Sequence, residues 1–193
     1  FGYVFFQCLV LTSFGDKILL TRAPDLRQAQ NTSNIKDIRI WVDKDNNNPA
    51  DDLKSILKEL NLENKHLGIE YDAYGLTGKN TMMLNESLNN FANLHDESFL
   101  VTKHRLVKSN EEIKYIKKAG ELADKALEKA WELSHPGADE SDILSAMQGA
   151  IFSGGGDYPG NEFIIGSGSN ALLCRYFSGR RKLDPVDQLT LEF

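Results

Sequence analysis

Cysteine and basic residues are both scarce in this chain of 193 residues. The two cysteines, Cys8 and Cys174, lie far apart and fit no metal-binding or redox spacing, which argues against a disulfide scaffold. Lysine and arginine number 22 against 28 aspartates and glutamates, so the net charge is −6. A broad nucleic-acid surface requires a strongly basic field. We therefore expect a reduced, cytoplasmic protein that binds no nucleic acid.

Long hydrophobic runs are also missing. The apolar run at residues 2–11 is far shorter than the roughly 20 residues that a membrane-spanning helix needs. It lacks the positive flank of a signal peptide, and no small-residue cleavage site follows it. A buried strand is the better interpretation of this segment, and we expect no membrane partner.

Several familiar site motifs are absent as well. None of the four histidines has a second ligand three or four residues away, so no helical zinc site is predicted and the histidines are expected at the surface. The segment Gly166 to Asn170 could cradle an anion with its amides, but no Gly-Lys-Ser/Thr follows to complete a phosphate-binding loop. A glycine turn that leaves a strand is the favoured interpretation.

The composition that remains is that of a globular protein with a real core. Apolar residues make up 41% of the chain and charged residues 26%. Strands mixed with helices in the first half predict an α/β class in which helices pack on a mixed sheet. The expected elements are a hairpin around residues 13–16, a strand at 38–42, a helix from Pro49, a strand at 66–70, a helix at 79–93 and a last strand at 98–101.

A capping box formed by Ser109 and Glu112 marks a change to a helical pattern in the second half. Apolar residues at helical spacing predict a helix that ends near Ser134. Asp139 is placed to cap the next helix, which is expected over residues 140–152. Strand patterns follow at residues 163–165 and 187–193.

A basic cluster at residues 175–182 is the most suggestive feature for binding, because it places four cations in an otherwise acidic chain. Arginine presents paired donors that suit carboxylates or phosphates, and neighbouring aromatic rings can frame a small ligand. Arg175 and Tyr176 follow an apolar segment directly and are expected to point inward as substrate-binding residues. The other three cations fit a ligand site and a solvated hairpin tip equally well; they are Arg180, Arg181 and Lys182.

Glu192 lies between two apolar residues in the last predicted strand. A carboxylate in that position is either a surface residue on the alternating face or an inward metal ligand. The alternation taken by itself favours the surface.

The second half resembles the creatinase and Xaa-Pro peptidase family (M24), whose catalytic domain has the pita-bread fold. The resemblance rests on ordered segments, none of which is specific alone. They are Arg105-x-x-Lys108-Ser109-x-x-Glu112-Ile113, Pro136-Gly137-Ala-Asp-Glu140, Ile165-Gly-Ser-Gly-Ser-Asn170 and Leu183-x-x-x-Asp187-Gln-Leu-Thr-Leu-Glu192. The string from Ala171 to Arg181 is similar to a creatinase-like branch that includes dimethylsulfoniopropionate lyases.

This resemblance implies a two-domain architecture. Residues 1–103 would form a creatinase/prolidase-type N-terminal mixed α/β domain whose start is missing. Residues 104–193 would form the truncated start of a pita-bread α+β catalytic domain. We accordingly expect the chain to be a fragment that is inactive by itself, with the catalytic residues beyond Phe193, and we expect a homodimer for the full-length protein.

The resemblance also implies a two-metal site with divalent ions held by two Asp, one His and two Glu. The first of these Asp positions is occupied here by Glu192, which keeps an oxygen ligand on a longer arm, and the remaining ligands would follow Phe193. The fragment is therefore not expected to bind the metals fully. A substrate-contacting His of the peptidases is replaced by Arg175, whose fixed positive charge favours an anionic group.

Three functions agree with these features. The first is an Xaa-Pro aminopeptidase- or dipeptidase-like metallohydrolase that acts on a small zwitterionic or carboxylate-bearing substrate. The second is a creatinase-type lyase or amidinohydrolase, such as a dimethylsulfoniopropionate lyase, and is motivated by Arg175 and Glu192. The third is a non-catalytic pita-bread binding protein.

Overall fold

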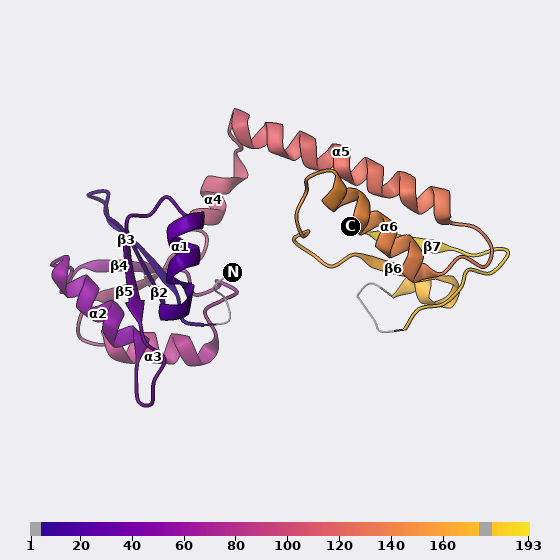
Figure 1. Ribbon diagram of the computed structural model, residues 1–193. Coiled ribbons are helices and arrows are strands. Elements are labelled where there is room, and N and C mark those ends of the chain that lie inside the picture. Colours follow the sequence, from indigo (N-terminus) through magenta and orange to yellow (C-terminus); the bar gives the residue numbers. More distant parts are fainter. Residues whose placement is uncertain (1–4, 174–178) are drawn as a thin grey trace. The chain divides into compact units, whose positions relative to one another are not determined.

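The computed structural model describes residues 5–173 and 179–193, which fall into two compact units. Unit 1 comprises Phe1–Val107 and unit 2 comprises Lys108–Phe193 (Figure 1). The predicted boundary between residues 103 and 104 falls inside helix α4 (Leu100–Leu106). Each unit combines helices with strands, which confirms the predicted mixed α/β class. Within the described residues, no helix is both long and apolar enough to cross a membrane.

Unit 1 begins with a three-stranded sheet in the order β1-β2-β3. The predicted hairpin is present: β1 and β2 pair antiparallel around a turn in which Gly15 adopts a positive φ of 100°. The third strand pairs parallel to β2. The elements of this part are β1 (Cys8–Leu11), β2 (Lys17–Arg22), η1 (Ala23–Asp25), α1 (Leu26–Thr32) and β3 (Asp37–Trp41).

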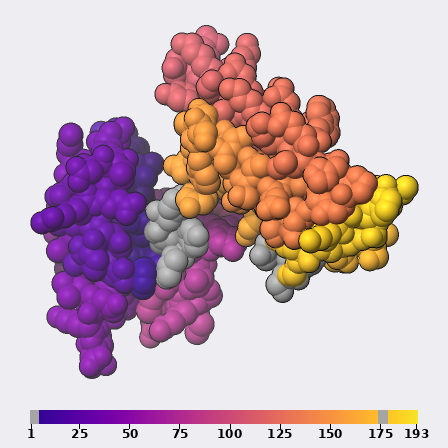
Figure 2. Space-filling view, turned by 45° about the vertical axis from the view of Figure 1, so that its right-hand side comes forward, coloured from indigo at the N-terminus to yellow at the C-terminus, as the bar shows by residue number. Residues whose placement is uncertain are grey.

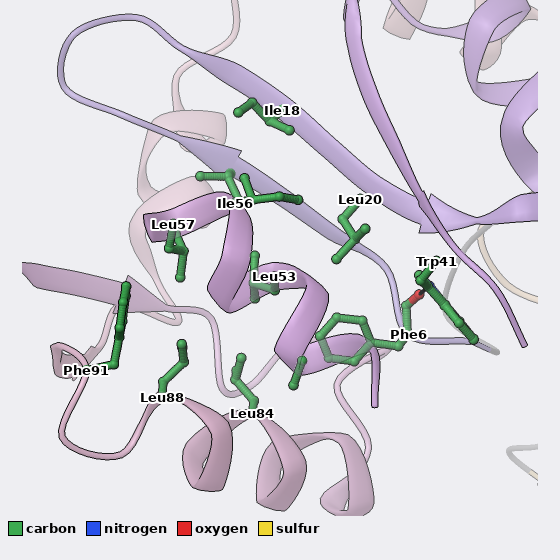
Figure 3. Close-up of a cluster of buried hydrophobic side chains, with 12 residues drawn as sticks. Phe6, Ile18, Leu20, Trp41, Leu53, Ile56, Leu57, Leu84, Leu88 and Phe91 are labelled. Carbon is green, nitrogen blue, oxygen red and sulfur yellow. Dashed lines mark hydrogen bonds between the residues drawn. The ribbon is translucent and has the colours of Figure 1, made fainter. Parts of the chain in front are cut away.

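The core of unit 1 is formed by this sheet together with two helices that pack on each other, α2 (Pro49–Glu59) and α3 (Gly78–Leu88). Figure 3 shows Ile56 of α2 directed toward Ile18 of β2, with Leu84 and Leu88 of α3 directed toward α2. The indole nitrogen of Trp41 donates a buried hydrogen bond of 2.9 Å to the carbonyl oxygen of Phe6. A second sheet consists of β4 (His66–Ile69) and β5 (Asn93–Asp96), which pair parallel.

The segment after α3 differs from the prediction. The strand expected at residues 98–101 is wrong, because Leu100 and Val101 belong to α4 and the strand is β5. The strand was predicted because the run Phe99 to Val101 is apolar, but these side chains are exposed in the structure. The actual strand, β5, carries only one partly buried apolar residue, Leu94. The predicted helix at 79–93 also ends earlier, at Leu88, and the backbone turns at Asn90 with a positive φ of 55°.

Unit 2 is built around the predicted pair of helices, α5 (Asn110–Leu133) and α6 (Glu140–Ser153), which lie side by side. The capping box that opens α5 is formed as predicted: the backbone N–H of Ser109 donates to Glu112 Oε2, and Ser109 Oγ accepts from the backbone N–H of Glu112. In the space-filling view these two helices, coral to orange, supply much of the visible surface of unit 2 (Figure 2).

Both helices pack on one face of an antiparallel strand pair, β6 (Ile164–Ser167) and β7 (Leu189–Glu192). Ile165 and Leu191 are Cα partners and both contact the helical core of unit 2. Because side chains alternate along a strand, the neighbours of Ile165 on β6 and of Leu191 on β7 face away from the helices. The short helix η2 (Gly168–Leu172) follows β6 directly.

Candidate functional site

The best-built polar cluster of the described residues lies in unit 2, where α6, β6 and the segment before β7 meet. Glu140 is the first residue of α6, and its side chain is fully buried. Its Oε1 accepts hydrogen bonds from Ser167 N at 3.0 Å and from Ser167 Oγ at 2.6 Å. Its Oε2 accepts from the backbone N–H of Arg181 at 3.2 Å. Three donors therefore satisfy a carboxyl group that burial alone would disfavour.

Arg181 extends this cluster toward β7. Its Nη1 donates to Ser167 Oγ at 2.8 Å and to Asp187 Oδ2 at 2.7 Å, and its Nη2 donates to Asp184 Oδ2 at 2.5 Å. The hydrogen bond to Asp187 is the main reason that the pKa of Arg181 lies above its usual value. We call Glu140, Ser167, Arg181, Asp184 and Asp187 the Glu140 network.

Asp187 has its pKa held below the usual range, first by the backbone N–H of Asp184, which donates to its Oδ2 at 2.8 Å, and also by Arg181. Gly168 shows how closely the chain passes this network. It has a positive φ of 56°, and a Cβ placed there would lie 2.6 Å from Arg181 Nη1 and 2.7 Å from Asp187 Oδ1. A side chain at this position would displace the guanidinium, so a glycine is required.

The Glu140 network fixes both ends of the segment that carries the predicted substrate-binding residues. Ser167 lies on its N-terminal side and Arg181 on its C-terminal side. Arg175 and Tyr176 themselves lie outside the described residues, so their predicted role is untested. Arg181, for which a ligand site and a hairpin tip were equally possible, instead forms internal ion pairs.

The remaining two cations of the basic cluster differ in position. Arg180 is partly buried and lines a cavity of about 610 Å³ in unit 2, together with residues of α6 and of the loop at 158–163. Lys182 is exposed, and its backbone forms an isolated bridge with Asp139. This arrangement leaves Arg180, rather than Arg181, beside open space.

Glu192 lies at the end of β7 with an exposed side chain. Its Oε1 accepts a hydrogen bond of 2.9 Å from Asn161 Nδ2. Because Leu191 packs on the helices, Glu192 points to the sheet face that the helices do not cover. The carboxylate is therefore accessible on that face, and its predicted role as a metal ligand is untested.

A two-metal centre does not fit the described residues taken by themselves. Within residues 5–173 and 179–193, no three His, Cys, Asp or Glu side chains come together in a group that could hold a metal ion. Glu192 supplies a single carboxylate, and the carboxylates of the Glu140 network are occupied by N–H and O–H donors. The chain therefore offers one candidate ligand and no assembled centre.

A second cavity, of about 410 Å³, lies in unit 1 and is lined by residues of β1, α2, β4 and α3. Cys8 lines it from β1, and burial raises the pKa of this thiol to about 11. A thiol with so high a pKa is protonated at neutral pH and is a poor nucleophile. Cys8 is therefore a poor candidate for a catalytic nucleophile in this cavity.

The Glu140 network was not predicted as a unit from the sequence. Glu140 and Arg181 are 41 residues apart, and each was considered in a local setting as a helix residue or as part of a basic cluster. The only signal in the sequence was that Glu140 begins a predicted helix and that Arg181 precedes Asp184 and Asp187. That pattern alone does not specify which partners meet.

Comparison with family models matches both units. Residues 1–107 match the Creatinase/Prolidase N-terminal domain, and residues 114–193 match Metallopeptidase family M24. The two matches follow one another in the order that the resemblance implied, and they confirm it.

Three relatives of known sequence illustrate the similarity. The uncharacterized hydrolase/peptidase y4tM of Sinorhizobium fredii is 29% identical over 82% of this chain and 43% of its own length. The ectoine hydrolase of Halomonas elongata is 26% identical over 88% of this chain and 47% of its own length. The Xaa-Pro aminopeptidase of Haemophilus influenzae is 26% identical over 57% of this chain and 26% of its own length.

Solved structures confirm the predicted fold. The X-Pro aminopeptidase from Thermotoga maritima has a TM-score of 0.79 at 17% identity, with 96% of this chain and 49% of that chain covered. The Xaa-Pro dipeptidase from Bacillus anthracis has a TM-score of 0.75 at 23% identity, with 97% and 50% covered. The chain thus spans about half or less of the length of the proteins it matches.

Proposed function

The chain belongs to the Creatinase/Prolidase N-terminal domain family, and we propose that the whole protein is an Xaa-Pro aminopeptidase- or dipeptidase-like metallohydrolase of Metallopeptidase family M24. The observation that carries this proposal is the pair of family matches in one chain, in family order and over nearly its full length. Relatives named Xaa-Pro aminopeptidase and Xaa-Pro dipeptidase support the same reaction class.

Arg175 and Tyr176 contribute to substrate binding in this proposal. Arg175 binds a carboxylate of the substrate through its paired N–H donors, and Tyr176 frames the ligand. The Glu140 network supports this proposal because it joins Ser167 and Arg181, which flank these two residues in the sequence. The substrate class is therefore a small zwitterionic or carboxylate-bearing molecule.

Glu192 would supply one carboxylate oxygen to a divalent two-metal centre, and such a centre would provide the hydrolytic chemistry of the proposed enzyme. The described residues do not assemble such a centre, so the proposal requires further ligands besides Glu192. The role of this chain is thus to present Arg175 and Glu192 on one unit.

Turnover of Xaa-Pro peptides by the purified whole protein tests the proposal. Hydrolysis of Ala-Pro points to a dipeptidase, and release of the first residue from a longer Xaa-Pro peptide points to an aminopeptidase. Arg175→Ala should raise KM for Ala-Pro at least about tenfold, since a charged hydrogen bond is worth 1.5–3 kcal/mol. Arg27→Ala, an exposed arginine of unit 1, is the matched control and should leave KM unchanged.

A second candidate is a creatinase-type lyase or amidinohydrolase that acts on a small non-peptide carboxylate. It is favoured by Arg175 in place of the peptidase histidine and by the relative named ectoine hydrolase, which covers 88% of this chain. Dimethylsulfoniopropionate and creatine are the probe substrates. Turnover of either one, with Ala-Pro left intact, would replace the first candidate by the second.

Two further proposals can be tested on the whole protein: a non-catalytic role and the oligomeric state. Bound metal measured by elemental analysis, together with turnover of at least one of these probes, argues against a binding protein without activity. Absence of both would overturn both enzyme candidates. We also propose that the whole protein is a cytoplasmic homodimer, and a monomeric mass by light scattering would contradict the dimer.

A further inference from the structure

Two histidines from different parts of unit 1 lie side by side on the outer face of the β4–β5 sheet. His66 Nδ1 and His95 Nε2 are 2.7 Å apart, and the two ring centroids are 4.9 Å apart. The sequence had predicted surface histidines without a local partner. Instead, the two histidines are partners of each other: they lie 29 residues apart in the chain and are brought together by strand pairing.

The strand register explains why both rings point the same way. His95 is the Cα partner of Gly68, which lies two residues after His66 on β4. Residues two apart on a strand, and residues paired across strands, share one face of a sheet. The alternate residues Leu67 and Leu94 pack against the core, so the histidines occupy the solvent-exposed face.

Gly68 lies on the same face as the two rings, and another side chain takes the space beside it. The side chain of Glu97 passes over Gly68, since a Cβ placed there would lie 2.7 Å from Glu97 Cγ. Within the described residues, no third side chain joins the pair in a metal-binding group, so any further ligands would be water.

The distance between the two ring nitrogens suits a shared metal ion. Zinc–imidazole bonds measure about 2.0–2.1 Å, so two nitrogens on one ion lie roughly 2.9–3.4 Å apart, depending on the angle between them. The gap of 2.7 Å needs to open by only a few tenths of an ångström. Each ring must also turn so that its lone pair points at the ion rather than at the other nitrogen. Both side chains are exposed, so rotations about χ1 and χ2 can supply these movements without disturbing the core.

We propose that His66 and His95 form a two-histidine surface site for a divalent transition-metal ion such as Zn²⁺, Ni²⁺ or Cu²⁺. The ion takes the place of the proton that the two nitrogens share in the metal-free pair, and water fills its remaining positions. Imidazole suits these ions, whereas Mg²⁺ and Ca²⁺ prefer oxygen ligands. The site lies in unit 1, and its existence does not depend on the catalytic function proposed above.

The first test is titration of the 193-residue chain with Ni²⁺ and Zn²⁺ by calorimetry. The variants are His66→Gln, His95→Gln and the double substitution, and the matched control is His104→Gln with His135→Gln, two exposed histidines outside the pair. Loss of one of two linked ligands should weaken this binding event by about 10²-fold. The double variant should lose this binding event entirely. The control variant should bind Ni²⁺ and Zn²⁺ as the parent chain does, and Mg²⁺ should show no such binding event.

Site-specific evidence comes from the imidazole ¹H–¹⁵N correlation spectrum during the same titration. Zn²⁺ should shift the His66 Nδ1 and His95 Nε2 resonances together, with His104 and His135 unmoved. Circular dichroism of each variant excludes loss of fold as the cause. Equal affinity in the double variant and the control pair, or shifts spread over all four rings, would overturn the proposal and leave the pair as a hydrogen bond alone.

Discussion

Glu140, the first residue of α6, and Ser167, the last residue of β6, are joined by two hydrogen bonds to one carboxylate oxygen in the interior of unit 2. The bonds tie the start of a helix to the end of a strand that lies 27 residues further along the chain. Since the backbone N–H of Ser167 is buried, it has no water to replace the carboxylate. The contact is therefore structural, and it sets the position of the segment that follows β6.

Substitution Glu140→Gln should destabilise unit 2 by about 1–3 kcal/mol, because an amide presents a donor where the native carboxylate accepts from three donors. Urea unfolding measures the change, and faster hydrogen exchange at the Ser167 amide locates it. Glu111→Gln is the matched control, since Glu111 occupies the first turn of α5 but is exposed. A loss as small as that of the control would show that water or a shifted side chain satisfies the donors.

Gly168→Ala tests the close approach of the backbone to Arg181. The new methyl group meets Arg181 Nη1 and Asp187 Oδ1, and alanine is also disfavoured at the positive φ of 56°. Gly155→Ala is the matched control, because Gly155 has a positive φ of 83° but no atom within 4 Å of the added carbon. We expect Gly168→Ala to destabilise unit 2 by at least about 1 kcal/mol more than the control. Equal losses in urea unfolding would assign the whole effect to φ.

These two positions show what the sequence can and cannot predict. The helix α5 and its capping box were predicted correctly because Ser109 and Glu112 are three residues apart and their hydrogen bonds are local. The Glu140–Ser167 and His66–His95 contacts arise from packing and strand register, which no local pattern encodes.

Misassignment of residues 98–101 has a related cause. An apolar run predicts burial, but here Phe99, Leu100 and Val101 remain exposed, and the last two lie in helix α4. The strand is instead the more polar β5. The roles of Arg175, Tyr176 and Glu192 came from the family resemblance and stay predictions. The family itself could be predicted because its segments recur in a fixed order along the chain.

The stability of unit 2 should depend on acid pH through Asp187. Its folded-state pKa is lowered by the Asp184 N–H and by Arg181, so its contribution is fully present above the unfolded-state pKa of about 3.9. That contribution is lost as the pH falls through the lower folded-state pKa. Asp187→Asn should therefore reduce stability at pH 7 and flatten its decline below about pH 4.

Urea midpoints between pH 7 and pH 2.5 measure this dependence. The control is Asp124→Asn, which removes an exposed carboxylate of α5 and should leave the decline as steep as in the parent chain. If Asp187→Asn declines as steeply as the control variant, the carboxylate does not contribute in the folded state as its contacts with Arg181 and Asp184 imply.

Alkylation of Cys8 should be slow at pH 8 because burial raises the pKa of its thiol to about 11, against an ordinary value of 9.0. The thiolate fraction falls about 100-fold, and its greater nucleophilicity recovers roughly tenfold, so we expect a rate at least tenfold below that of the unfolded chain. Iodoacetamide labelling in a Cys174→Ser background, followed by mass spectrometry in buffer and in guanidinium chloride, measures both rates. The folded-state rate should keep rising about tenfold per pH unit past pH 9, since the thiol is still mostly protonated there. A plateau near pH 9 would mean that the cavity beside Cys8 is hydrated and that the thiol is not buried.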